Sequence, residues 1–171
     1  MGHQAALFNE LEAGLGEVKQ PPLQDLADLA RRAVACARTG QWEGALALAG
    51  NVLNTAMEHH GVAWYRDEFK GVRGDNNVPI VGMTGPGATI QWIVDTVALP
   101  ERVVGVFELP AHLVVRPLAY VFRKNETTQE TFNRHLAAHR SSHDSFREVF
   151  VVPTLLNVHA LLRGLDVKMR G

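Results

Sequence analysis

The sequence predicts a mainly α-helical, compact single domain over residues 1–171, with a short extended or β-hairpin insert near 62–82. Two observations carry this prediction. Apolar residues recur at three- and four-residue steps over 23–56 and again over 132–150, the spacing that places them on one face of a helix. The length is also sufficient for one domain to bury a proper core.

Three helices are expected in the first 58 residues. Residues 4–18 carry leucines and Phe8 at helical spacing, and Pro21-Pro22 prevents the helix from continuing. Residues 23–58 repeat the pattern on both sides of Gly40, which ends one helix so that another begins at Trp42. The segment 23–58 is therefore predicted to be an antiparallel helical hairpin.

The segment 61–82 is predicted to be extended, as an ordered loop or a short hairpin. The run Val62-Ala63-Trp64-Tyr65 favours strands, because β-branched and aromatic residues are enriched there. Glycines, Asp75 and two asparagines follow it and are typical of turns.

Further helices are expected over 88–164. A helix is predicted from Ala88 to Leu99, and the long stripe over 126–150 predicts the clearest helix of the chain. A terminal helix opens at Pro153 and stops at Gly164. Residues 101–123 are compatible with two short helices or with a strand, and the helices are favoured.

The composition excludes several classes of protein. Seventeen basic and eighteen acidic side chains give a net charge of -1, so a broad positive field for nucleic acid is not expected. Cys36 is the single cysteine, which excludes an intramolecular disulfide and favours a reducing compartment. With neither a signal peptide nor a membrane-length apolar run expected, the sequence predicts a cytoplasmic protein that does not bind membranes.

A glycine-rich turn offers the sharpest hypothesis for an enzyme. Gly82, Gly85 and Gly87 precede a helix and could cradle phosphate with backbone amides, assisted by Thr89. In this alternative, residues 78–108 form a Rossmann-like βαβ unit whose Glu108 contacts the ribose. Ala88 stands where a phosphate-binding loop requires lysine, so nucleotide hydrolysis is not expected; the simpler interpretation is a tight turn without a ligand.

Three histidines on the predicted long helix form the second candidate site. His135, His139 and His143 are spaced so that neighbouring pairs can chelate zinc. All three cannot hold one ion, because eight residues of helix rise about 12 Å. Packing of these imidazoles in a helix seam is the favoured interpretation, and no metal or other cofactor is predicted.

Residues 23–56 resemble one tetratricopeptide repeat, because Gly40-Gln41-Trp42-Glu43-Gly44-Ala45-Leu46 matches its turn and the opening of its second helix. One unit by itself describes an ordinary helical hairpin better than a solenoid. The resemblance nevertheless keeps a helical-repeat-like adaptor open as a third function.

Residues 23–166 resemble, in layout, the helical immunity proteins of bacterial polymorphic-toxin systems, the type numbered forty-nine among immunity families. The matching features are the hairpin, the insert, Gly85-Pro86-Gly87-Ala88 leading into a helix, a helix pair over 103–120, and Pro153-Thr154-Leu155-Leu156 opening the last helix. The resemblance implies a noncatalytic protein that neutralises a cognate toxin.

The leading hypothesis is therefore a protein-binding protein, with a toxin or another protein as its partner and its oligomeric state left open. The predicted insert is the expected contact surface, because aromatic and loop residues are common in interfaces. The candidate contact residues are Trp64, Tyr65, Arg73, Asp75, Asn76 and Asn77.

Overall fold

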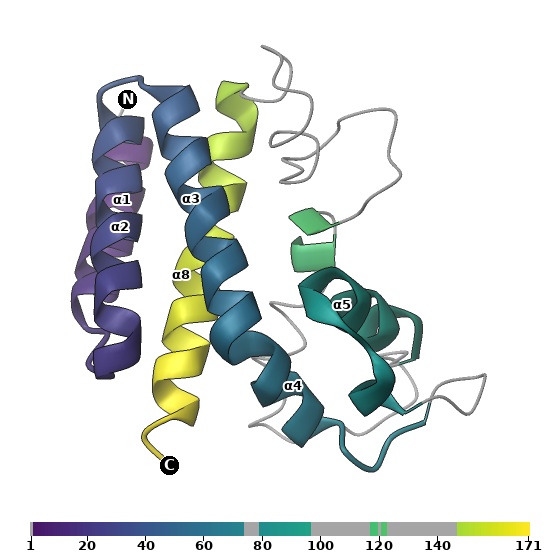
Figure 1. The fold of residues 1–171 in the computed structure, drawn as a ribbon. Helices are drawn as coiled ribbons and strands as arrows, with labels where there is room; N and C mark the ends of the chain where they lie inside the picture. The colour runs from purple at the N-terminus through teal and green to yellow at the C-terminus, as the bar shows by residue number, and fades with distance from the viewer. Residues whose placement is uncertain (1, 74–78, 97–116, 120, 123–146) are drawn as a thin grey trace.

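The computed structural model describes residues 2–73, 79–96, 117–119, 121–122 and 147–171 (Figure 1). Over these ranges the chain is helical and forms no β-strand, so the predicted mainly α class is confirmed. The predicted helices at 101–123 and 126–150 lie outside the described residues, apart from short helical pieces at 117–119 and 121–122 and the last residues before 150.

Four helices pack side by side into a bundle (Figure 1): α1 (Gly2–Gly16), α2 (Pro21–Arg38), α3 (Trp42–Ala56) and α8 (Val151–Lys168). α2 lies against the other three. Most alanines of α2 and α3 face inward and are buried, and small side chains let the helix axes approach closely. The buried alanines are Ala27, Ala30, Ala33, Ala37, Ala45, Ala49 and Ala56.

The predicted hairpin over 23–58 is confirmed, and its turn depends on one glycine. Gly40 has a φ of 74°, a left-handed conformation that other residues adopt at a cost. Gln41 N–H donates back to the Cys36 carbonyl at 2.9 Å, closing the end of α2 before α3 begins. A proline or β-branched residue at position 40 would break this connection.

The prediction of extended structure is wrong over residues 61–68, where the chain is helical. α3 runs on through a single π-helical turn, Met57–Gly61, into α4 (Val62–Glu68), which veers away from the bundle (Figure 1). Val62, Tyr65 and Phe69 are buried at three- and four-residue spacing, so packing at helical period overrides the strand preference of these residue types. A π turn adds one residue to the helical repeat and redirects the side chains that follow it.

After α4 the chain forms a short turn and then α5, which packs against α4. Arg73 and Pro79 form an isolated antiparallel bridge, the 3₁₀ turn η2 covers Ile80–Gly82, and α5 spans Gly85–Thr96. The alternative βαβ unit required a strand before the glycine-rich turn, and residues 79–82 are not a strand. Proline 79 and the three-residue turn after it explain the difference, since proline cannot donate to a β-ladder.

α8 is preceded by a 3₁₀ turn, Glu148–Phe150, and together they are long and apolar enough to cross a membrane by length and composition. The inward face of α8 packs against α1, α2 and α3. Its buried leucines and valines therefore belong to the protein core, and core helices commonly pass the same test; these residues are Val151, Leu155, Val158, Leu161, Leu162 and Leu165.

Candidate functional site

The structure describes three of the six predicted contact residues, Trp64, Tyr65 and Arg73. Arg73 is exposed after α4, while Asp75, Asn76 and Asn77 lie outside the described residues. Trp64 is half-buried and packs over Gly164 of α8, where an added Cβ would come within 3.1 Å of the tryptophan Cη2 atom. Trp64 therefore attaches α4 to the bundle.

Tyr65 was wrongly placed on the contact surface, because its side chain is completely buried. Its ring stacks on Trp64 with centroids 4.9 Å apart and an interplanar angle of 15°. Burial raises the pKa of the Tyr65 hydroxyl above its ordinary value. This tyrosine contributes to packing and is not available to a partner unless α4 moves.

One exposed apolar residue lies two positions after Pro79, the bridge partner of Arg73. Val81 is 59% exposed on the turn at 80–82, while its neighbour Ile80 is completely buried and anchors that turn. The Arg73–Pro79 bridge holds both chain segments together. We call Lys70, Arg73 and Val81 the α4–η2 edge; all three are exposed.

A hydrogen bond from Arg66 stabilises the segment that follows this edge. The Nη2 atom of Arg66 donates to the Met83 carbonyl oxygen, just after the turn, and so connects α4 to the segment that leads into α5. The Nε atom of the same guanidinium is buried without a hydrogen-bond partner. An apolar side chain and an arginine on a braced turn form an arrangement that suits recognition of another protein.

The described residues of the predicted glycine-rich nucleotide site make contacts within the fold. Gly85 begins α5 with a φ of 78°, and the buried Thr89 hydroxyl donates to the Gly85 carbonyl at 2.9 Å. A Cβ on Gly87 would lie 3.3 Å from the carbonyl oxygen of Phe122, so this glycine allows a close backbone approach. Gly82 is exposed in the preceding 3₁₀ turn, and Glu108 lies outside the described residues.

The candidate metal ligands His135, His139 and His143 also lie outside the described residues. Within 2–73, 79–96 and the other described ranges, no three His, Cys, Asp or Glu side chains converge as a metal site would require. His59 and His60 are adjacent on the π turn with ring centroids 6.3 Å apart. Burial is the main cause that lowers the pKa of His60, and the neighbouring His59 lowers it further.

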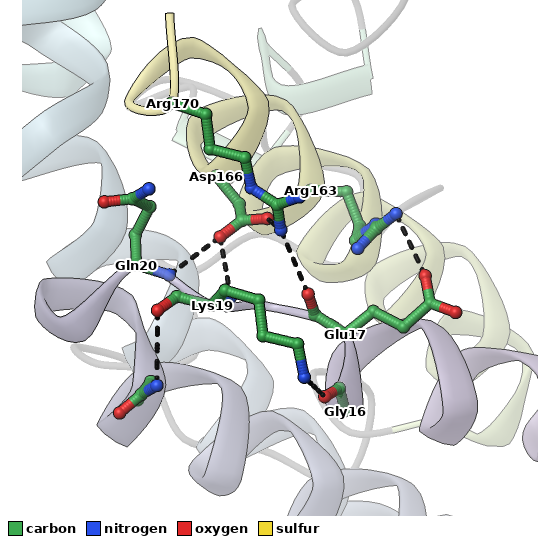
Figure 2. Close-up of polar contacts among 8 residues, drawn as sticks. Gly16, Glu17, Lys19, Gln20, Arg163, Asp166 and Arg170 are labelled. Atoms are coloured by element: carbon green, nitrogen blue, oxygen red, sulfur yellow. Dashed lines mark hydrogen bonds and ion pairs between the residues drawn. The ribbon is translucent and has the colours of Figure 1, made fainter.

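One fully buried carboxylate among the described residues was missed from the sequence. Asp166 of α8 is fully buried and accepts hydrogen bonds from the backbone N–H groups of Lys19 at 2.7 Å and Gln20 at 2.9 Å (Figure 2). Arg170, one helical turn later, donates to its other oxygen. Pro21 and Pro22 have no N–H, so the last two amides before α2 are the ones satisfied here.

The pKa of Asp166 reflects competing causes. Burial alone raises it, but the backbone hydrogen bonds from Gln20 and Lys19, together with Arg170, outweigh that effect and leave the pKa below its ordinary value. The carboxylate therefore stays ionised and fastens the α1–α2 connection to α8. Its role is structural.

The seam between α1 and α8 contains a second close contact. His159 of α8 lies against Gly14 of α1, where an added Cβ would come within 2.2 Å of its Nε2 atom. Arg163 pairs with Glu17 at 3.1 Å on the same seam. Burial is the main cause that lowers the pKa of His159, Arg163 lowers it further, and Glu17 opposes the shift.

Two open hollows lie on the described surface of the bundle. One, of about 350 Å³, is walled by charged residues of α1 and α2, including Glu12, Asp28, Arg31 and Arg32. The other, of about 500 Å³, lies between Gln4 of α1 and the start of α8, where Val149 and Val152 line it. Neither brings together an acid, a base and a nucleophile.

Comparison with protein-family models, curated proteins and solved structures finds no match to this chain. Val81 and Asp166 were the residues missed from the sequence. The run 78–81 was considered only as a strand of the Rossmann-like alternative, and Asp166 lay beyond Gly164, the predicted end of the last helix. The signal that could have found Asp166 is the Pro21-Pro22 pair, because the amides before it need an acceptor from outside the helix.

Proposed function

We propose that the protein acts by binding another protein and that its partner is a bacterial toxin, which it neutralises without catalysis. The observation that carries the binding role is the exposed Val81, on the turn that follows the Arg73–Pro79 bridge. The toxin as partner rests on the layout resemblance to helical immunity proteins. No step of chemistry is needed for this role.

The α4–η2 edge suits recognition because it is exposed and braced. An exposed valine loses contact with water when a partner covers it, and a fully covered side chain of this size contributes about 1.5–3 kcal/mol. Arg73 adds hydrogen-bond donors in a planar array that fits carboxylates. The buried Ile80 and the Arg66–Met83 hydrogen bond reduce the conformational entropy lost on binding.

The charge of the edge indicates the kind of patch it would meet. Lys70 and Arg73 are both basic and exposed, and the bridge between Arg73 and Pro79 joins their segment to the turn that carries the apolar Val81. A complementary partner surface would be apolar at its centre and acidic at its rim. An inhibited toxin with an acidic face fits this description.

The first test is affinity capture with wild type and Val81→Asp compared side by side. We expect one protein to be retained in stoichiometric amount by wild type and at least tenfold less by the variant, since the aspartate would be desolvated at the interface. Val149→Asp is the matched control, because Val149 is 64% exposed but lies at the start of α8. Equal retention by Val81→Asp would exclude the α4–η2 edge.

The second test asks whether the captured protein is a toxin. Cells producing it should stop growing, wild-type protein should restore growth, and Val81→Asp should not. A captured protein that leaves growth unaffected would contradict the immunity role while retaining the binding role. The nucleotide-binding alternative predicts a rise in melting temperature with ATP or NAD, which the proposed function does not.

A further inference from the structure

The contact between α1 and α8 encloses one face of a titratable side chain. The Nε2 atom of His159 faces the α-carbon of Gly14, since a Cβ added to this glycine would lie 2.2 Å from it. Within the part of the chain that the structure describes, the imidazole has no hydrogen-bond partner. A neutral nitrogen packs well against a methylene group, but a protonated histidine carries N–H on both ring nitrogens. The Nε2–H of the imidazolium would therefore point at carbon.

Burial and a neighbouring charge oppose the imidazolium further. His159 is half-buried, so a charge on its ring loses part of its hydration. Arg163 lies one helical turn later on α8 and adds a like charge. Both effects lower the pKa of His159, and burial is the larger of the two. The neutral ring is therefore the form that suits the closed contact.

Glu17 of α1 is the charged group that favours the imidazolium. Its carboxylate pairs with Arg163 at 3.1 Å (Figure 2), so the imidazolium would compete with a guanidinium for it. α2 and α3 also pack against α8, but none of their described charged side chains shifts the pKa of His159. While α1 stays in place, the balance of these groups disfavours a proton on His159.

α1 is also fastened at points that do not depend on His159. Asp166 accepts hydrogen bonds from the connection between α1 and α2, and Arg38 of α2 donates to Asn9 of α1 at 2.7 Å. When α1 moves away from α8, these contacts keep it tethered and the freed imidazole turns to water. A helix of 15 residues is marginally stable without packing, so the amides of α1 would then exchange with solvent.

We propose that the α1–α8 seam, formed by Gly14, Glu17, His159 and Arg163, is an acid-sensitive contact: a proton on His159 favours a local opening in which α1 leaves α8 while α2 and α3 stay packed. The pKa of the freed ring returns toward its ordinary value of 6.5, whereas that of the enclosed ring is lower, so the opening increases as the pH falls below 6.5. The Asp166 carboxylate stays ionised near pH 5, because its pKa lies below its ordinary value of 3.8, and the tether is kept.

Hydrogen exchange of the intact chain at about pH 7.5 and about pH 5 tests the opening, with each rate corrected for the intrinsic effect of pH. We expect the protection of α1 amides to fall roughly two- to threefold relative to that of α2 amides on acidification. His159→Gln should remove this fall, because glutamine does not titrate. An equal fall in α1 and α2, or a fall that persists in His159→Gln, would overturn the proposal.

Two variants that break the same ion pair separate titration from a loss of packing. Glu17→Gln removes the charge that favours the imidazolium, so the acid-induced opening of α1 should increase. Arg163→Gln removes the opposing charge and leaves Glu17 free to accept a hydrogen bond from the imidazolium, so the opening should decrease. Changes of the same sign in the two variants would show that the ion pair acts through packing alone and would overturn the proposal.

Discussion

The bundle of α1, α2, α3 and α8 and the region of α4 and α5 pack through different types of residue. The bundle packs alanines and leucines along whole helices and has a buried carboxylate at its end. The region of α4 and α5 relies on aromatic residues: Trp64 stacks on Tyr65, and Phe69 lies 6.5 Å from Trp92 between ring centroids. It begins at a π turn rather than at an ordinary helix end.

Among the described residues, the two regions share one hydrophobic core, and the side-chain contacts at its margin are partly exposed. Trp64 packs on Gly164, and Lys168 lies 3.7 Å from Asp67 and 3.4 Å from Glu68. Surface ion pairs of this kind contribute little, typically below 1 kcal/mol. We infer that the bundle acts as the scaffold, while the surface proposed for recognition belongs to the region of α4 and α5, which is attached less firmly.

The largest expected effect is at Asp166. Asp166→Ala leaves two partly buried backbone amides without an acceptor and should lower the free energy of unfolding by about 2–3 kcal/mol, measured by urea denaturation. Asp166→Asn keeps one acceptor oxygen and should lose less. Equal losses in the two variants would contradict the hydrogen-bond account.

Stability should also depend on the ionisation of the Asp166 carboxylate at acid pH. Because the folded pKa of Asp166 lies below its ordinary value of 3.8, its contribution is complete above that pH and is lost as the pH falls through the folded pKa. Wild type should therefore lose more stability than Asp166→Asn on acidification below pH 4.

These two regions also explain how much could be predicted from the sequence. Helical spacing with a glycine stop predicted α2, α3 and their turn, because bundle helices need only one apolar face. α4 was missed because Val62, Trp64 and Tyr65 prefer strands by residue type, although Val62, Tyr65 and Phe69 already had helical spacing. Val81 lies in the 3₁₀ turn that follows the Arg73–Pro79 bridge, and no periodic pattern in the sequence predicts which residue of that turn is exposed.

Gly14→Ala should give the next largest effect, within the bundle. The new methyl group would overlap His159, so the free energy of unfolding should fall by about 1–3 kcal/mol. Gly16→Ala is the control, since nothing lies within 4 Å of its added Cβ. The double variant Gly14→Ala, His159→Ala should recover part of the loss; failure to recover would show that the clash lies elsewhere.

Gly164→Ala tests the attachment between the regions. Its methyl group would lie 3.1 Å from Trp64, which is half-buried and can tilt outward, so a smaller loss of about 1 kcal/mol is expected. Tryptophan fluorescence should shift, and hydrogen exchange should quicken in α4 but not in α2. Unchanged exchange in α4 would mean that Trp64 does not hold this region to the bundle.

The smallest expected effect is the titration of His159. Its folded pKa lies below 6.5, so the neutral form stabilises the fold above that pH, and stability declines as the pH falls below 6.5 toward the folded pKa. His159→Gln should remove a few tenths of a kcal/mol of this decline. The difference between the two unfolding curves isolates His159 from His60, whose pKa is also lowered.

Native-state hydrogen exchange on the intact chain tests the difference between the two regions most directly. We expect the amides of α2, α3 and α8 to exchange only through global unfolding. The amides of α4 and α5 should exchange through a local opening of lower free energy. Equal protection in the two regions, lost together at one denaturant concentration, would contradict the division into a scaffold and a more loosely attached recognition region.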